Sequence, residues 1–373
     1  MKKMVLPILL LAFFLIPFFV FAQTESAFED SPNDSFFKAE VIEIIEEKIN
    51  TLPDGSEVRQ QNLLLRGLEG EFRDKEIEFN GIGPLDVLSK NIYKTGDKVL
   101  TVASYGADGN AAYYITDYVR SKSLWIIAIV FALALVIVGR IKGLRSLLAL
   151  LLTFFVIIKY IIPQILAGAS PLVTTFIGSI AILLIIIYVT EGWRARSHIS
   201  VISIFFSLII TILISWLFVS LTKLTGAASE DILFLVNIGE QAINFKGLLL
   251  AGVIIGALGV LDDVVISQVS TVEQIVRVNN SLNKKQIFRH AYKVGVSHIA
   301  SMTNTLFLAY AGVSLPLLIL FVSGESAFAG WSQAVNSELI ATEIVRTLAG
   351  SIGLILSVPI ATFIAVRWYG KHN

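Results

Sequence analysis

The chain contains no cysteine among its 373 residues, and it has few charged residues for its length. The lack of cysteine excludes disulfides, thiol catalysis and cysteine-ligated metals. Charged residues make up only 16% of the chain, and their net charge is zero, so no general attraction to nucleic acid is expected. Hydrophobic residues make up 55%, and the mean hydropathy is +0.76. This composition predicts a membrane protein.

Several enzyme motifs are also missing. The sequence has no H-E-x-x-H, no G-x-x-x-x-G-K-[ST] and no G-x-S-x-G. An intramembrane aspartyl protease needs carboxylates from two separate helices, whereas the two aspartates inside apolar segments here are adjacent in one segment. We therefore expect no enzymatic activity, no cofactor and no metal site.

The N-terminus has the pattern of an export signal. Lys2 and Lys3 precede an apolar run over residues 4–21, and small residues precede a possible cleavage point after Ala22. This pattern predicts a signal peptide over residues 1–22, or an uncleaved anchor, because the run is about long enough to span a bilayer. Residues 23–35 are polar and are expected to form a flexible linker. Either alternative delivers the next residues outside the cytoplasm.

Residues 36–120 have the pattern of a small β domain. Alternating apolar and polar residues, separated by turn residues, predict five short strands at 38–45, 62–66, 71–79, 98–104 and 111–115. Five strands in ~80 residues favour a small OB-like β-barrel. This domain contains no catalytic or phosphate-binding motif, so we expect residues 36–120 to bind an envelope protein or the mouth of the membrane domain.

A membrane domain is expected over residues 121–373. Most of its apolar segments approach the ~20 residues needed to span a bilayer. There are seven of them, at 123–138, 147–162, 172–190, 199–220, 247–272, 295–321 and 344–366. Basic residues concentrate in alternate loops and at the C-terminus, which places the C-terminus in the cytoplasm and the β domain outside. The loops expected inside hold Arg140, Lys142, Arg145, Arg194, Arg196, Arg277, Lys284, Lys285, Arg289, Lys293, Arg367 and Lys371.

The segment 247–274 carries two adjacent carboxylates, Asp262 and Asp263, well inside its ends. Small residues let another helix approach closely, and a carboxylate in lipid is costly unless it faces protein or water. Steps of three or four residues place several such side chains on one stripe of the helix, which we expect to face the protein interior. The stripe contains Gly252, Gly256, Gly259, Asp263, Ser267, Ser270 and Gln274.

The next two segments supply further polar and small residues. Helical rise brings Asn304 to a depth similar to that of Asp263, while His298 lies nearer the inner surface. In the last segment, Gly350 and Gly353 form another small-residue stripe suited to close packing. The candidates for ion or proton coupling are Asp262, Asp263, Ser267, Ser270, Ser301, Asn304 and His298.

A structural role is the alternative for each of these candidates. The two aspartates could form a hydrogen-bonded pair, although adjacent helical residues point ~100° apart and need not share a partner. Asn304 and Ser301 could simply hold helices together. Glu343 and Arg346 are spaced as an i,i+3 pair near the expected outer interface, and we expect them to act as an anchor too distant to neutralise Asp263.

Three long runs resemble the YibE/F family of bacterial multi-spanning membrane proteins. They are GALGVLDDVVISQVSTVEQI, VGVSHIASMTNTLFLAYAGVSLPLLIL and EIVRTLAGSIGLILSVPIAT, at 256–275, 294–320 and 343–362. The resemblance extends over the chain after the signal, including the β domain that ends in YYITDYVR at 113–120. It implies a multi-pass protein of the bacterial cytoplasmic membrane, in contact with the lipid bilayer, and it implies no particular activity.

The Asp-bearing region is also similar to RND-type and SecD/SecF-type membrane domains. In both, a span with an aspartate is followed by a short cytoplasmic amphipathic helix, here 283–293, and two more spans. This analogy favours a proton- or ion-coupled transporter or an export-assisting protein. The chain departs from that group in its number of spans and its smaller outward domain. The alternative is a non-transporting scaffold or receptor whose β domain binds an envelope partner.

Overall fold

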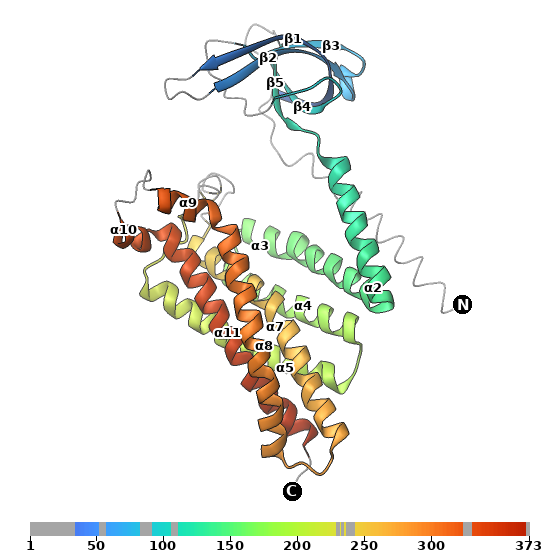
Figure 1. Ribbon diagram of the computed structural model, residues 1–373. Helices are drawn as coiled ribbons and strands as arrows, with labels where there is room; N and C mark the ends of the chain where they lie inside the picture. Colours follow the sequence, from blue (N-terminus) through green and yellow to red (C-terminus); the bar gives the residue numbers. More distant parts are fainter. Residues whose placement is uncertain are drawn as a thin grey trace, which may run out of the picture. The chain divides into compact units, whose positions relative to one another are not determined.

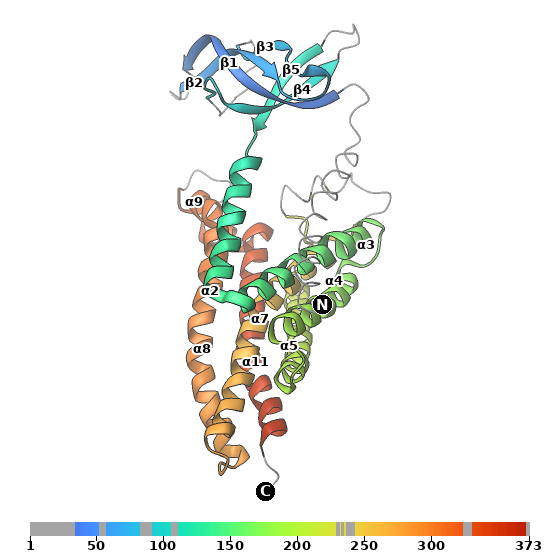
Figure 2. The ribbon, with the colours of Figure 1, turned by 90° about the vertical axis from the view of Figure 1, so that its right-hand side faces the viewer.

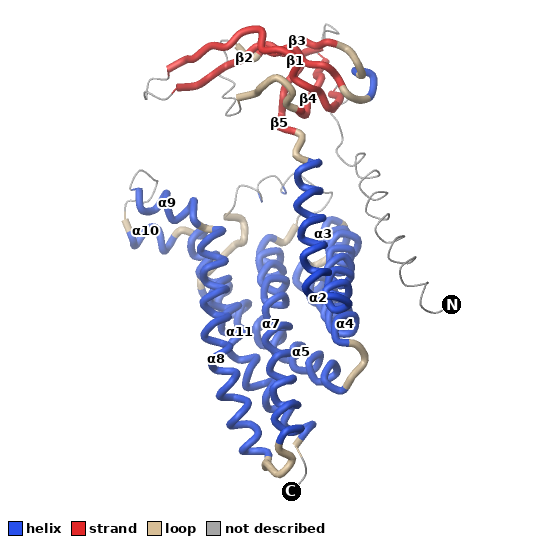
Figure 3. The backbone as a smooth tube through the Cα atoms, turned by 45° about the vertical axis from the view of Figure 1, so that its right-hand side comes forward, coloured by secondary structure: helices blue, strands red, loops and turns tan. Residues whose placement is uncertain are grey.

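The structure, a computed structural model, describes residues 34–51, 57–82, 92–105, 111–228, 232, 235, 243–323 and 330–370. It divides into two compact units, one ending at Val130 and the other beginning at Phe131. The strands lie in the first unit, and nearly all of the helical residues lie in the second (Figure 3). The expected signal segment 1–22 and residues 23–33 of the expected linker lie outside the described residues. The last two linker residues, Asp34 and Ser35, already belong to the first strand.

The first unit is an open five-stranded antiparallel sheet with the strand order β3-β2-β1-β4-β5 (Figure 1). The predicted number of strands is confirmed, but the predicted OB-like barrel is wrong. The edge strands β3 and β5 do not pair with each other, so the sheet does not close. One cause is local, because a 3-10 turn at Gly70–Phe72 replaces the first part of the expected third strand and leaves a short edge strand. The strands are β1 (Asp34–Thr51), β2 (Glu57–Gly67), β3 (Glu76–Asn80), β4 (Lys98–Tyr105) and β5 (Ala111–Tyr118).

The sheet buries apolar side chains on one face. Strand residues alternate between the two faces, as in β3, where Ile77 and Phe79 are buried between exposed neighbours. The 3-10 turn adds an aromatic ring to this core, because Phe72 stacks on Phe37 of β1 with 4.1 Å between ring centroids. Gly67 makes the turn possible, since a β-carbon at this position would collide with the backbone carbonyl of Phe72.

The end of the sheet is fixed by an exposed ion pair just before the first helix. Arg120 Nη1 lies 2.5 Å from Asp117 Oδ2. Asp117 Oδ1 also accepts a hydrogen bond from the Tyr118 amide at 2.8 Å. The bond with Arg120, followed by that from the Tyr118 amide, holds the pKa of Asp117 below its ordinary value. The junction therefore keeps its negative charge on Asp117 throughout the neutral pH range.

The first helical element is α2 (Ser121–Val156), which continues through a π-helical turn at Ile157–Ile161 into α3 (Ile162–Leu166). Its backbone is kinked at Arg140, where φ is 50° and ψ is −130°. A β-carbon on Gly143 would collide with the Leu135 carbonyl, which shows that the chain folds back on itself at the kink. The expected spans 123–138 and 147–162 therefore lie on either side of Arg140 within one helical element.

Among the described residues, five helices are long and apolar enough to cross a membrane, or six if the bent pair α8 and α9 is one broken span. The seven spans expected from the sequence count the two parts of α2 separately. The expected short helix 283–293 is continuous with the span that follows it, because α8 runs unbroken from Lys284. The bounds are Ser121–Leu166 for the α2–α3 element, α4 (Pro171–Glu191), α5 (Ala195–Leu221), α7 (Phe245–Val278), α8 (Lys284–Val313), α9 (Leu315–Ser323) and α11 (Glu338–Tyr369).

The centre of the second unit is formed by α5, α7 and α11, which pack extensively against one another (Figure 2). The α4 helix packs on α7, and α8 packs on α11 and α7. Fully buried side chains such as Leu208 and Val265 form its core. At one end of the bundle, Tyr369 of α11 lies within electrostatic range of Arg196 and Arg277. The structure thus gathers three basic regions that the sequence predicts to share one side of the membrane.

Candidate functional site

The two adjacent aspartates of α7 point to different sides of the helix. Asp262 is buried, with 9% of its surface exposed, whereas Asp263 is exposed. This confirms the expectation that they need not share a partner. Asp262 Oδ1 accepts a hydrogen bond from the Asp263 amide at 2.9 Å. Within the described part of the chain, no lysine, arginine or histidine lies within ion-pair distance of either carboxylate.

The expectation that the Asp263 stripe faces the interior of the chain is wrong for most of its length. Gly252, Gly259, Asp263 and Gln274 are exposed, while Gly256, Ser267 and Ser270 are only partly buried. The α7 helix turns a different side to the bundle, because large apolar side chains provide more burial energy there than glycines can. That side carries Leu250, Val253, Leu261, Asp262, Val265, Gln268, Val269 and Val272.

The neighbouring helix α8 places its polar residues next to the Asp263 side. His298 lies within electrostatic range of Asp263. Ser301 and Asn304 are both exposed, and in the described residues neither forms a hydrogen bond with Asp263 through its side chain. The structure therefore brings Asp263 and His298 together. Asn304, which was expected at a similar depth, forms no side-chain hydrogen bond with Asp263 in the described residues.

Gln268 forms a buried polar junction that the sequence did not identify. Its Nε2 atom donates to the Ala291 carbonyl of α8 at 2.9 Å and to Thr362 Oγ1 of α11 at 2.7 Å. Gly295 leaves room for it, since a β-carbon there would come within 2.7 Å of Gln268 Oε1. One amide thus links three helices a little more than one turn beyond Asp263. A glutamine in an apolar stretch was the available signal.

Replacing Gln268 by leucine should destabilise the junction of α7, α8 and α11. The change keeps the approximate volume but removes the donor to the Ala291 carbonyl and to Thr362 Oγ1. We expect a loss of about 0.5–2 kcal/mol, the range measured for hydrogen bonds between membrane helices. The measurement is the thermal or denaturant-induced unfolding of the purified protein. An unchanged midpoint would contradict the structural role assigned to Gln268.

A ladder of buried hydroxyls on α5 was also missed. Ser203, Ser207, Thr211 and Ser215 each donate a hydrogen bond of 2.7–2.8 Å to the carbonyl four residues earlier. All four are essentially fully buried. Their constant spacing of four was a visible signal, because it places them on one helix face. These small side chains allow α5 to approach its neighbours closely.

Only two of the five expected packing glycines lie at close helix contacts. A β-carbon on Gly353 would collide with Thr211 on α5, and one on Gly256 would lie 2.9 Å from the Tyr310 hydroxyl on α8. For Gly252, Gly259 and Gly350, no atom lies within 4 Å of the β-carbon position, apart from those of the glycine's immediate neighbours and of its own helix backbone. Gly353 and Gly256 thus permit close packing within the chain, whereas Gly252 and Gly259 are exposed.

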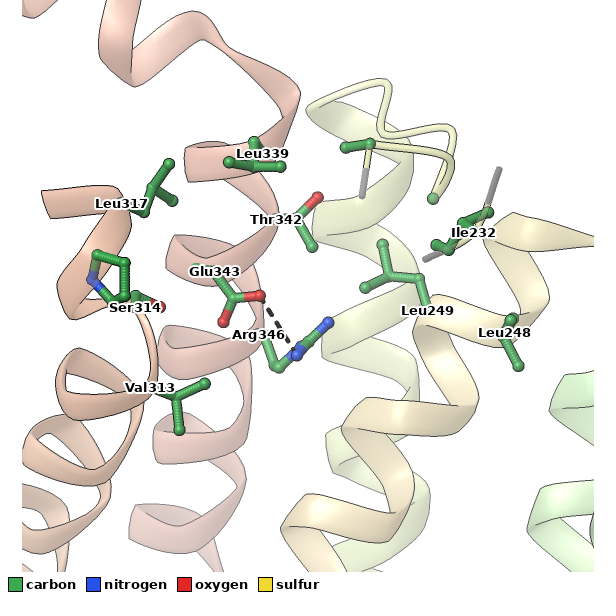
Figure 4. Close-up of a pocket in the computed structure, with 13 residues that line it drawn as sticks. Ile232, Leu248, Leu249, Val313, Ser314, Leu317, Leu339, Thr342, Glu343 and Arg346 are labelled. Carbon is green, nitrogen blue, oxygen red and sulfur yellow. Dashed lines mark ion pairs between the residues drawn. The ribbon is translucent and has the colours of Figure 1, made fainter. Parts of the chain in front are cut away.

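A second polar centre lies in a cavity of about 360 Å³ near the start of α11 (Figure 4). Arg346 Nη1 lies 3.3 Å from Glu343 Oε1, which confirms the expected i,i+3 pair. Glu343 Oε2 and Arg346 Nε are enclosed and have no hydrogen-bond partner among the described residues. The remaining wall is largely apolar and includes Leu248, Leu249, Val313, Pro316, Leu317 and Leu339.

The cavity is remote from the aspartates. Leu249 lines it from α7, and Asp263 lies fourteen residues further along the same helix, or ~21 Å by helical rise. This separation agrees with the expectation that Arg346 is too distant to neutralise Asp263. Among the residues that the structure describes, no group of three or more histidines, aspartates or glutamates could hold a metal ion. The aspartates and the cavity are thus separate polar sites in the bundle.

A comparison with protein families matches residues 127–371 to the model of YibE/F-like proteins. No curated protein and no solved structure matches the chain. The matched residues include both aspartates and the cavity. They begin after the β domain, so the family similarity established here concerns the helical part of the chain.

Proposed function

This chain belongs to the YibE/F-like protein family, and on that premise we propose that it is a proton- or ion-coupled transporter or an export-assisting protein that uses Asp262 and Asp263. One observation carries the proposal. Asp262 is a buried carboxylate in the middle of a long apolar helix, without a cationic partner in the described part of the chain. An ionisable residue at such a position is costly and marks ion or proton pathways.

The arrangement of the two aspartates supports this proposal. Asp263 opens to the outside of the bundle beside His298, whereas Asp262 faces inward one residue earlier. A proton or cation that reaches Asp263 could therefore pass to the carboxylate of Asp262, the preceding residue of the same helix. Binding neutralises a charge that apolar surroundings disfavour, so occupancy can be coupled to a rearrangement of α7.

The cavity near α11 is the proposed site for the transported solute. Helix α8 ends at this cavity, and α9 leaves it at an angle of 71°. Broken helices provide free backbone groups at the binding sites of many transporters. The Glu343–Arg346 pair has no net charge and the walls are apolar, so a small solute with little net charge matches the cavity best.

Removing the charge of Glu343 should lower the stability of the protein, and the size of this loss should depend on whether Arg346 is present. In a double-mutant cycle of Glu343→Gln and Arg346→Gln, we expect a coupling energy of about 1 kcal/mol in unfolding experiments, because the two side chains form an ion pair. Glu273→Gln is the matched control, since Glu273 pairs with Arg277 near the other end of the bundle. Strictly additive effects of the two cavity variants would contradict the pairing.

A scaffold or receptor is the second proposal. In this alternative the open sheet binds an envelope partner and the aspartates only contribute to helix association. Deletion of residues 36–120 should then remove function, while replacement of the aspartates should merely lower stability. In both proposals the chain is not an enzyme, the sheet lies outside the cytoplasmic membrane and the C-terminus lies in the cytoplasm.

A screen for sensitivity to metals and solutes tests the transport proposal. Cells that carry wild-type protein are compared with cells that carry the variant in which both aspartates are replaced by asparagine. The proposal expects a change in sensitivity to at least one solute or ion, with both proteins at equal levels in the membrane. Identical sensitivities across the screen would favour the scaffold.

A further inference from the structure

The surface formed by α7 and α8 is polar in the middle of its membrane-spanning part. We call Asp263 of α7 and His298, Ser301, Asn304 and Thr305 of α8 the polar face; all five are exposed. Asp263 lies ~27 Å from the start of α7 and ~22 Å from its end, counted at 1.5 Å per residue. Toward the start of α7, the helix next to the polar face consists of apolar residues and glycine, whereas beyond Asp263 the same side carries Ser267, Ser270 and Gln274.

Lipid is a poor cover for this face. A carboxylate or an amide in contact with acyl chains costs several kcal/mol unless it finds polar partners or water. Within the chain, the apolar part of α2 cannot supply them, because residues 126–139 consist only of apolar residues and glycine. The N-terminal run 4–21 is equally apolar. The polar groups must therefore be satisfied by something other than these segments.

We propose that the polar face is covered by the polar face of a second copy of this chain, in a two-fold symmetric dimer. The face is chemically self-complementary, since it carries an acid on α7 and a histidine and an amide on α8. A two-fold axis would place Asp263 of each copy against α8 of the other. Interhelical hydrogen bonds from serine, asparagine and histidine are the usual means of holding membrane helices together.

The glycines of α7 leave room for this contact. Gly252 and Gly259 lie on the same exposed side as Asp263, and no atom beyond their own helix and chain neighbours lies within 4 Å of a β-carbon at either position. Nothing among the described residues therefore requires glycine there. A close helix from a second copy would favour glycine, because small residues permit backbones to approach.

The dimer does not depend on the transport proposal. In a transporter, the second copy would add polar groups around Asp263 to His298, which the described part of its own chain provides. In a scaffold, the same contact would be purely structural. Failure of dimerisation and failure of transport can therefore be measured separately.

The lack of cysteine allows a direct test by cross-linking in native membranes. Single cysteines are introduced at Ser301, Asn304 and Thr305, and oxidation with copper phenanthroline is followed on non-reducing gels. Val296 and Phe307 are the controls, since they are exposed on the same helix but lie ~120–140° around it from Ser301, at 100° per residue. We expect at least fivefold more disulfide-linked dimer from the polar-face set. Equal cross-linking of both sets, or none from the polar-face set, would overturn the proposal.

A second variant protects the test against misfolding. Gly259 is exposed, and a β-carbon there meets no described atom within 4 Å, so expression and unfolding of Gly259→Leu should be unchanged, yet this variant should reduce cross-linking through Ser301→Cys at least fivefold. Undiminished cross-linking would overturn the proposed face. Asp262 faces the bundle, so the Asp262→Asn variant should still form the cross-link, even if it no longer supports ion-coupled flux. Loss of the cross-link in Asp262→Asn would also contradict the proposed face, whereas normal flux in that variant would count against the transport proposal alone.

Discussion

Replacing Asp262 and Asp263 together by asparagine should abolish ion-coupled flux while leaving the protein folded in the membrane. Asparagine has nearly the shape of aspartate and can still accept the 2.9 Å bond that the second residue donates to the first. It cannot bind a proton or balance the charge of a cation. The flux of protons or ions into proteoliposomes, driven by an imposed pH or ion gradient, should therefore fall to the level of protein-free vesicles.

The single variants sharpen this result. Asp262 is the buried member of the pair, so Asp262→Asn should cause most of the loss, while Asp263→Asn should alter the dependence on external ion concentration. The Gln268→Leu variant is a useful control, because it weakens helix association without removing a carboxylate. Normal gradient-driven flux in the double asparagine variant would refute the assigned role of the aspartates.

Replacing Gly353 by valine should strongly destabilise the contact between α5 and α11 in the helical unit. Its β-carbon would collide with the Thr211 side chain, which is fully buried and bonded to its own helix. Helices α5 and α11 would have to separate, and overpacking of this kind costs typically about 1–3 kcal/mol. We expect a lower unfolding midpoint and a reduced level of protein in the membrane.

Gly350 provides the matched control for this substitution. It lies one turn earlier on α11, and no atom outside its own stretch of helix lies within 4 Å of its β-carbon position. Gly350→Val should therefore lower stability much less than Gly353→Val. If both substitutions had the same effect, the cost would come from the properties of α11 itself and not from its contact with α5.

The sequence predicted those features that depend on local composition and periodicity. Long apolar runs identified the membrane class, alternation identified five strands, and the runs around Asp262 identified the family. Closure of the sheet was predicted wrongly because it depends on whether the first and last strands meet, which no local pattern specifies. The break between the first two apolar segments was also predicted, and the structure forms it as a kink at Arg140 inside one helical element.

The side of α7 that faces the bundle was predicted wrongly. A stripe of glycine, serine and aspartate indicates that something polar and close must cover it, but the stripe does not say whether the cover belongs to the same chain. The structure buries the side of α7 that carries Leu261 and Gln268, and it leaves Asp263 exposed. Gln268 and the α5 hydroxyls, which link or line helices within the bundle, were less conspicuous because they are uncharged polar residues in apolar segments.

The open edge of the sheet also affects which proteins can associate with it. A free edge strand is a template for pairing with another strand and hence a potential site of aggregation. The edge strand β3 carries exposed Glu76 and Glu78, so two identical edges would repel each other. The same charges would attract a strand rich in lysine or arginine. Any strand that paired with this edge would therefore lie beside two carboxylates.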